Sequence, residues 1–177
     1  MNLPAKIDAI VAEFAALPAW EDRYKRIIAL AKDLPAMPDA LKTDDRKVRG
    51  CSSTVWLHAE REGDRVLYHA DSDAVLVRGL VALLMRVYSG ERAEDILAAS
   101  PTFIERIGLN ANLSPNRANG LSSMVTQIRK QALDAFMAWK RDRPTEITPR
   151  ASRQVQPNSP LLRPHDDEDG TGTPAKV

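Results

Sequence analysis

The sequence predicts an α+β fold in which a small antiparallel β-sheet of about three strands is packed with helices before and after it. Three observations support this fold class. Apolar residues recur at helical spacing in the first 34 residues, strand-like alternation appears over residues 53–70, and helical spacing returns from residue 74 to about residue 141. A sheet segment that lies between two groups of helices is typical of α+β domains.

Two amphipathic helices are predicted at the N-terminal end of the chain. Apolar residues three and four positions apart mark the first helix over about residues 4–17, and Pro18 ends it. The second helix is predicted over about residues 20–34, because prolines at positions 35 and 38 stop the pattern. Residues 36–46 form a polar connection to the sheet.

The sheet is predicted from two strand arms and a short entering strand. Residues 53–60 alternate in polarity, the turn at 62–64 reverses the chain, and residues 65–70 return as the second arm. The connection is too short for a crossover, so the two arms must be antiparallel. Residues 47–49 are predicted as a further short strand. Because both faces of the first arm carry apolar side chains, we expect that arm to be the central strand.

Helices are predicted to follow the sheet. Residues 71–73 offer an N-cap to a strongly apolar helix over about residues 74–88. Two shorter helical pieces follow, one over about residues 91–99 and one after Pro101. Ser114 and Pro115 open a long final helix, with serine as the cap and proline at the first helical position, and it ends near residue 141.

The length and composition predict one domain over residues 1–143 and a disordered tail over 144–177. From residue 144 the periodic apolar pattern gives way to proline, serine, arginine and a cluster of acidic residues, and Leu161 and Leu162 are the exceptions that could dock. The net charge of +1, from 25 basic and 24 acidic residues, shows no bias toward nucleic acid. No apolar run is long enough to span a bilayer, so we expect neither nucleic-acid nor membrane binding.

The candidate reactive residue is Cys51, because it is the single cysteine among 177 residues. One cysteine cannot form an intramolecular disulfide or build a multi-thiolate metal site, so we expect no metal. It is either an inert buried thiol or a reactive thiolate. A glycine precedes it, polar residues follow it, and three cations at positions 46, 47 and 49 predict a lowered thiol pKa. With one free cysteine and no secretory pattern, we expect a cytoplasmic location.

Other residues offer weaker chemistry. His58 and His69 lie in opposite strand arms and could face each other, but ordinary strand positions explain them as well. A nucleophilic pair of Cys51 with His58 is disfavoured, because seven residues of extended strand span roughly 23 Å. Arg117 lies in the first turn of the final helix, where the helix dipole opposes a cation. Gly120 costs that helix about 1 kcal/mol relative to alanine, and it either allows close backbone packing or marks a bend.

Four stretches of the chain, found in order over about residues 1–140, resemble the SufE-type sulfur-acceptor family. One of them, Val-Arg-Gly-Cys-Ser-Ser-Thr-Val-Trp at residues 48–56, is similar to the family's glycine–cysteine–x–serine–x–valine–tryptophan motif. The others are residues 20–24, residues 71–74 with 77–80, and residues 113–121. One departure is visible, since Ser52 stands where many members carry glutamine.

The resemblance implies a SufE/IscU-like fold and a sulfur carrier that works with a pyridoxal-phosphate cysteine desulfurase, SufS-like or CsdA-like. Cys51 would accept persulfide sulfur, stimulate the desulfurase and relay sulfur to an iron–sulfur scaffold complex resembling SufBCD. The protein would need no cofactor of its own, and it would be an accessory protein more than an independent enzyme. The supporting or partner-docking residues that we expect are Arg49, Gly50, Ser52, Ser53, Asp71, Asp73 and Arg117.

The scaffold proteins that share this fold hold a nascent cluster with several cysteine ligands, and this chain has one. Residues Val55 and Trp56 could line a shelter for a persulfide. Two other functions stay open from the residues alone. One is a cysteine-nucleophile hydrolase or transferase, which needs a base within hydrogen-bond reach of Cys51. The other is a helical interaction module in which the cysteine is inert.

Overall fold

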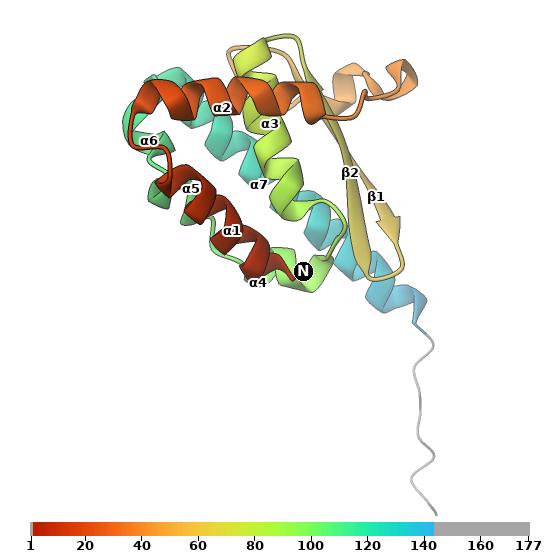
Figure 1. The fold of residues 1–177 in the computed structure, drawn as a ribbon. Coiled ribbons are helices and arrows are strands. Elements are labelled where there is room, and N and C mark those ends of the chain that lie inside the picture. Colours follow the sequence, from red (N-terminus) through yellow and green to blue (C-terminus); the bar gives the residue numbers. More distant parts are fainter. Residues whose placement is uncertain (1, 144–177) are drawn as a thin grey trace, which may run out of the picture. The chain divides into compact units, whose positions relative to one another are not determined.

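The computed structural model describes residues 2–143, and these residues adopt the predicted α+β fold (Figure 1). The predicted tail, residues 144–177, lies outside the described residues. None of the described helices combines the length and apolarity needed to span a membrane. Two short 3₁₀ turns, Asp39–Leu41 and Asp44–Arg46, lie in the polar connection before the sheet. The other elements in chain order are α1 (Leu3–Ala15), α2 (Trp20–Asp33), β1 (Val55–Glu62), β2 (Arg65–Ser72), α3 (Val75–Tyr88), β3 (Glu91–Arg92), α4 (Ala93–Ala98), α5 (Phe103–Arg106), α6 (Leu109–Asn112) and α7 (Pro115–Asp142).

The sheet has three antiparallel strands in the order β1-β2-β3. β1 and β2 pair along their whole length, from Val55 opposite Ser72 to Glu62 opposite Arg65. The third strand differs from the predicted one. Residues 47–49 make only an isolated bridge, Lys47 with Trp56, whereas the two residues of β3 pair with the start of β2. A two-residue strand carries no periodic signal, so the sequence pattern could not identify it.

The prediction that the first arm is central is wrong, because β2 is the central strand and β1 lies at an edge. The apolar bulk on the second face of β1 comes largely from Trp56. The polar connection covers this side chain, and the Lys42 ammonium lies 5.9 Å from the centre of its ring. The polar connection therefore covers this face of β1, where the alternation pattern had led us to expect packing against a neighbouring element.

The main core lies between one face of the sheet and the helices α3 and α7. Val55, Leu57 and Ala70 project from the sheet toward residues of both helices. The buried Tyr68 hydroxyl donates a hydrogen bond of 2.8 Å to the carbonyl oxygen of Ile128, which fixes α7 against β2. α3 also packs tightly on α2. A Cβ atom at position 79 would lie 2.1 Å from the carbonyl oxygen of Ile27, so only glycine allows this approach.

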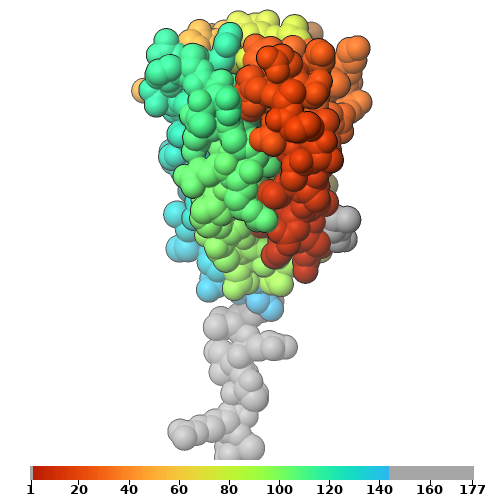
Figure 2. Space-filling view, turned by 60° about the vertical axis from the view of Figure 1, so that its left-hand side comes forward, coloured from red at the N-terminus to blue at the C-terminus, as the bar shows by residue number. Residues whose placement is uncertain are grey.

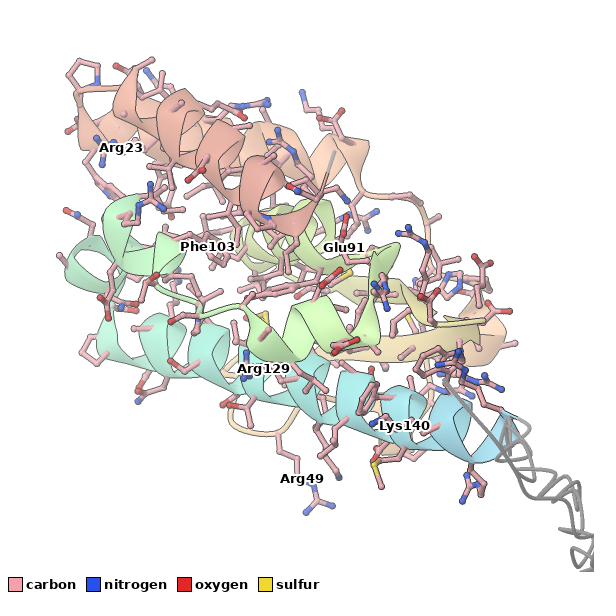
Figure 3. All side chains as sticks on the ribbon, turned by 90° about the horizontal axis from the view of Figure 1, so that it is seen from below. Arg23, Arg49, Glu91, Phe103, Arg129 and Lys140 are labelled. Atoms are coloured by element: carbon pink, nitrogen blue, oxygen red, sulfur yellow. The ribbon has the colours of Figure 1, made fainter. Side chains whose placement is uncertain are left out.

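The shorter helices α4 to α6 lie beside α1 on one face of the domain, as Figure 2 shows for the green and red segments. Two arginines join this layer to the rest of the domain (Figure 3). Arg23 donates to the carbonyl oxygens of Leu17 and Ile107, at 2.7 and 3.1 Å. Arg129 of α7 donates to carbonyl oxygens at the end of α4 and just beyond it, namely those of Ile96, Leu97 and Ala99. Both guanidinium groups satisfy main-chain acceptors that the helix ends leave free.

The predicted N-cap at residues 71–73 is wrong in its detail. β2 continues to Ser72, and Ala74 occupies the N-cap position of α3 without a side-chain hydrogen bond to the helix. Asp71 is 4% exposed, and its carboxylate forms ion pairs with Lys42, at 2.9 Å, and with Arg78. The Arg78 guanidinium also donates to main-chain carbonyls at the end of α2. This buried carboxylate therefore joins α2, the polar connection, β2 and α3.

The Asp71 cluster predicts a large loss of stability for Asp71→Asn. The substitution leaves Arg78 without a counter-charge and leaves Lys42 with only the exposed Asp39, at 3.6 Å, which together cost about 2–3 kcal/mol of unfolding free energy. The cost stays below that of a fully buried pair, because the Lys42 and Arg78 side chains are 27% and 29% exposed. Urea denaturation of both proteins measures the difference. Asp22→Asn is the matched control, because its surface pair with Lys25 should contribute less than about 1 kcal/mol.

Candidate functional site

Cys51 lies on the loop that enters β1, and the glycine before it determines how this loop sits. Gly50 has φ +88°, a conformation that favours glycine over residues with a side chain. It also rests against α7, because a Cβ atom at position 50 would lie 2.7 Å from the Ser123 hydroxyl oxygen. A residue with a side chain at position 50 would strain the turn, and the Ser123 side chain would have to move to make room for it.

The Cys51 thiol is half-buried and packs against the main chain of α7. Its Sγ atom lies 3.5 Å from the carbonyl oxygen of Gly120, which accepts a hydrogen bond from the thiol. A Cβ atom at position 120 would lie 3.4 Å from Sγ, so the glycine leaves open the space beside the thiol. Of the two roles considered for Gly120, the structure therefore supports close backbone packing.

A small pocket surrounds the thiol, with a volume of about 10 Å³, roughly the space of one water-sized sphere. Its remaining walls come from the loop, from α3 and from the first three turns of α7. They are Ser52, Ser53, Val77, Leu80, Asn116, Arg117 and Met124. Val55 and Trp56, which we expected to shelter the cysteine, do not line this pocket. Sequence reasoning placed Val77 and Leu80 on an apolar helix, but only the tertiary packing brings them to the thiol.

Burial raises the pKa of the Cys51 thiol above its ordinary value, so the neutral form is favoured in this conformation. The prediction that nearby cations lower this pKa is wrong here. Arg49 is exposed and projects away from the domain (Figure 3). Lys47 pairs with Asp44 at 2.6 Å, and Arg46 donates to the carbonyl of Ala40. Closeness in sequence did not place these charges near the sulfur.

Short contacts from the end of β2 hold the other end of the cysteine loop. The Thr54 amide donates a hydrogen bond of 3.0 Å to the Asp73 carboxylate. The Thr54 carbonyl accepts from the Ser72 hydroxyl at 2.8 Å and from the Asp73 amide at 3.3 Å. Asp73 is therefore a supporting residue that fixes the loop. Asp71 is also supporting, because its burial removes it from any docking surface in this state.

Arg117 lies at the rim of the cysteine pocket, where α7 begins. Its side chain is exposed, and among the described residues no ion pair or hydrogen bond engages the guanidinium. It does not pair with Asp73, the internal carboxylate that would have given it a purely structural role. Ser52 is exposed and Ser53 is half-buried beside it, so both lie where an approaching partner would meet the loop.

The described residues place no general base beside Cys51. Neither a histidine nor a carboxylate lines its pocket. The His58 ring stacks on His69, with 6.3 Å between ring centres, and His69 lies 3.2 Å from the Glu60 carboxylate. Burial lowers the pKa of His58, and the charge of Arg46 contributes. Within residues 2–143 no group of three histidine, cysteine, aspartate or glutamate side chains is placed to hold a metal ion.

The raised thiol pKa predicts an unusual pH profile for alkylation of the free protein by iodoacetamide. Because the reagent attacks the thiolate, the rate should increase with pH around a midpoint higher than that of a cysteine peptide in the same buffer. Asp73→Ala should loosen the loop, increase the rate several-fold and shift the midpoint down. Glu62→Ala, at the far end of β1, should change neither quantity. A midpoint equal to that of the peptide would show that the thiol is not buried in solution.

Comparison with known proteins yields one consistent family. The family model described as "SufE: Fe-S metabolism associated domain" matches residues 8–132. An uncharacterized SufE-like protein of Rhizobium meliloti is 44% identical over 131 residues, which cover 71% of this chain and 94% of the relative. The sulfur acceptor protein CsdE of Escherichia coli is 39% identical over 117 residues, which cover 65% of this chain and 80% of that protein.

A solved structure has the same fold. It is the solution structure of a hypothetical protein from Thermus thermophilus, with a TM-score of 0.66 and 26% sequence identity, and the match covers 77% of this chain and 99% of that one. The family match spans the cysteine loop, α3 and the first two-thirds of α7, which together build the Cys51 pocket. The chain therefore belongs to the SufE family.

Proposed function

We propose that this protein is a sulfur acceptor that takes persulfide sulfur from a cysteine desulfurase onto Cys51 and passes it on to iron–sulfur cluster assembly. The observation that carries the proposal is the single cysteine of the chain, held on an irregular loop beside a pocket for about one small atom. Membership in the SufE family supports it, as does the relative that is named a sulfur acceptor.

The proposed transfer is a thiol–persulfide exchange. The Cys51 thiolate attacks the terminal sulfur of the partner's cysteine persulfide, a new S–S bond forms on Cys51, and the partner's S–S bond breaks. The partner's cysteine leaves as a thiolate and takes up the proton that Cys51 lost. The sulfur atom moves together with its electrons between equivalent S–S bonds, so no external oxidant or reductant is required. Pyridoxal phosphate belongs to the partner, which generates the persulfide.

The described conformation suits storage of the Cys51 thiol, and its reaction with a partner requires a different one. In the described conformation the thiol is neutral, half-buried and hydrogen-bonded to Gly120, which protects it and also slows its attack. Reaction requires Sγ to reach bonding distance of a sulfur on another protein, so the loop must leave α7. The packing of Gly50 and Cys51 on α7 and the hydrogen bonds at Thr54 hold it in place. Docking of a partner on Ser52, Ser53 and Arg117 would offset the loss of these contacts.

Cysteine chemistry with an independent substrate has less support. A hydrolase or transferase needs a base near the nucleophile, and the described residues supply none at Cys51. An inert cysteine in an interaction module would leave unexplained why the thiol lies on an irregular loop beside an open space that Gly120 leaves free. Relay to a SufBCD-like scaffold and a cytoplasmic location remain parts of the proposal that follow from the family resemblance.

The direct test is sulfur uptake by Cys51. The intact mass should increase by one sulfur atom after incubation with a SufS-like or CsdA-like desulfurase and cysteine, and dithiothreitol should remove the added mass. Cys51→Ser should fold with an unchanged melting temperature, gain no mass and fail to stimulate the desulfurase. Full stimulation by the serine variant would falsify the acceptor role.

Arg117 should act in docking and not in folding. Arg117→Ala removes an exposed cation without a partner among the described residues, so its melting temperature should shift by less than about 2 °C. Stimulation of the desulfurase should decrease several-fold. Lys130→Ala is the matched control, because it removes an exposed cation farther along the same helix and should change neither property. A large melting shift with unchanged stimulation per folded molecule would place Arg117 in the scaffold instead.

A further inference from the structure

A second and larger pocket of the described residues lies apart from Cys51. It is a groove with a volume of about 400 Å³ between the end of α2, the outer edge of β2 and α3, the elements that lie together in the upper right of Figure 1. No residue lines both this groove and the Cys51 pocket. We call it the β2 groove. Its lining residues are Leu30, Asp33, Leu34, Pro35, Ala36, Met37, Leu67, Tyr68, His69, Ala70, Ala82, Met85, Arg86 and Ser89.

One wall of the β2 groove is an unpaired strand edge. Hydrogen bonds from the Gly90 amide to the Val66 carbonyl (2.8 Å) and from the Tyr68 amide to the Ser89 hydroxyl (3.0 Å) show which side of β2 faces away from β1. Main-chain groups of alternate residues point to the same side of a strand. The Tyr68 carbonyl and the Ala70 amide therefore point into the groove, and no hydrogen-bond partner for either is found among the described residues.

The charged side chains that line the β2 groove leave one carboxylate without a partner among the described residues. Of the ionisable side chains that line it, Arg86 pairs with Glu13 at 2.9 Å and His69 pairs with Glu60 at 3.2 Å. Asp33 is exposed and forms no ion pair within residues 2–143. It lies at the last residue of α2, where the helix dipole disfavours an anion. A basic group bound in the groove would satisfy this carboxylate.

We propose that the β2 groove binds an extended segment of a partner protein, which adds as a strand to the free edge of β2. The segment's main chain would donate to the Tyr68 carbonyl and accept from the Ala70 amide. An apolar side chain would contact Met37 and Met85, and a neighbouring lysine or arginine would pair with Asp33. β3 already pairs with the start of this edge, so the added segment would continue its line.

The observations favour an extended peptide over other occupants. An apolar small molecule would fill the walls but leave the Ala70 amide unpaired, which is costly in a buried site. A second copy that met this groove with its own groove would bring two Asp33 carboxylates together, and like charges repel. A backbone supplies alternating donors and acceptors at the strand repeat, and a basic side chain supplies the missing counter-charge.

The test uses three synthetic hexapeptides and the full ¹⁵N-labelled chain. The first peptide alternates valine and threonine around one lysine. The second replaces the lysine with glutamate, and the third carries the lysine but is N-methylated at alternate amides. Titration followed by NMR should show saturable binding of the lysine peptide, with the largest amide shifts at residues 67–70. The N-methylated peptide should bind at least about fivefold more weakly, because it lacks main-chain donors.

Charge reversal provides the matched control. Asp33→Lys should weaken the lysine peptide about fivefold and strengthen the glutamate peptide, whereas Glu21→Lys, the same charge change at the start of α2, should alter neither. Ala70→Pro removes an amide that points into the groove and should abolish binding, but it also places a ring at a buried position of β2. If this variant unfolds, the comparison of Asp33→Lys with Glu21→Lys tests the proposal by itself. The proposal is overturned if no peptide saturates, if the shifts map elsewhere, or if the N-methylated peptide binds equally well. Sulfur uptake by Cys51 should be normal in Asp33→Lys, so the two proposals can fail independently.

Discussion

The ion-pair cluster around Asp71 is the constraint on which the rest of the site depends. A buried carboxylate is tolerated only when charged partners surround it, and here Lys42 and Arg78 do so. Because Arg78 also binds the main chain at the end of α2, one cluster fixes the positions of two helices, a loop and the end of β2. The contacts of Asp73 with Thr54 begin two residues farther along, so the cluster also anchors the cysteine loop.

The cysteine loop is fixed at its two ends by different means. At Thr54 it is held by hydrogen bonds from the end of β2. At Gly50 it contacts the Ser123 side chain of α7, and at Cys51 it packs on the main chain at Gly120. The contacts at Thr54 fix where the loop meets β1, and those with α7 can be lost without disturbing the core. Such an arrangement lets a small segment move while the domain stays folded. This division suits a thiol that is stored in one place and reacts in another.

The domain separates two surfaces with different chemistry. The Cys51 pocket is small, lies between loop and helices, and has at its rim a cation that no residue of 2–143 pairs with. The β2 groove is larger and mostly apolar, and the carboxylate at its edge likewise has no ion-pair partner in the described part of the chain. α3 contributes to both, with Val77 and Leu80 at the first and Ala82 and Met85 at the second. One buried helix can therefore hold both surfaces in fixed positions.

The sequence by itself determined the fold class, the helices, the hairpin and the candidate reactive residue, because periodicity, turn residues and a single cysteine are local signals. Tertiary structure alone decided the identity of the third strand, the edge position of β1 and the role of residues 71–73. It also decided the direction in which the pKa of Cys51 shifts, since burial raises it although cations are its neighbours in sequence. Burial and charge pairing depend on which distant segments meet, and no local pattern encodes those distances.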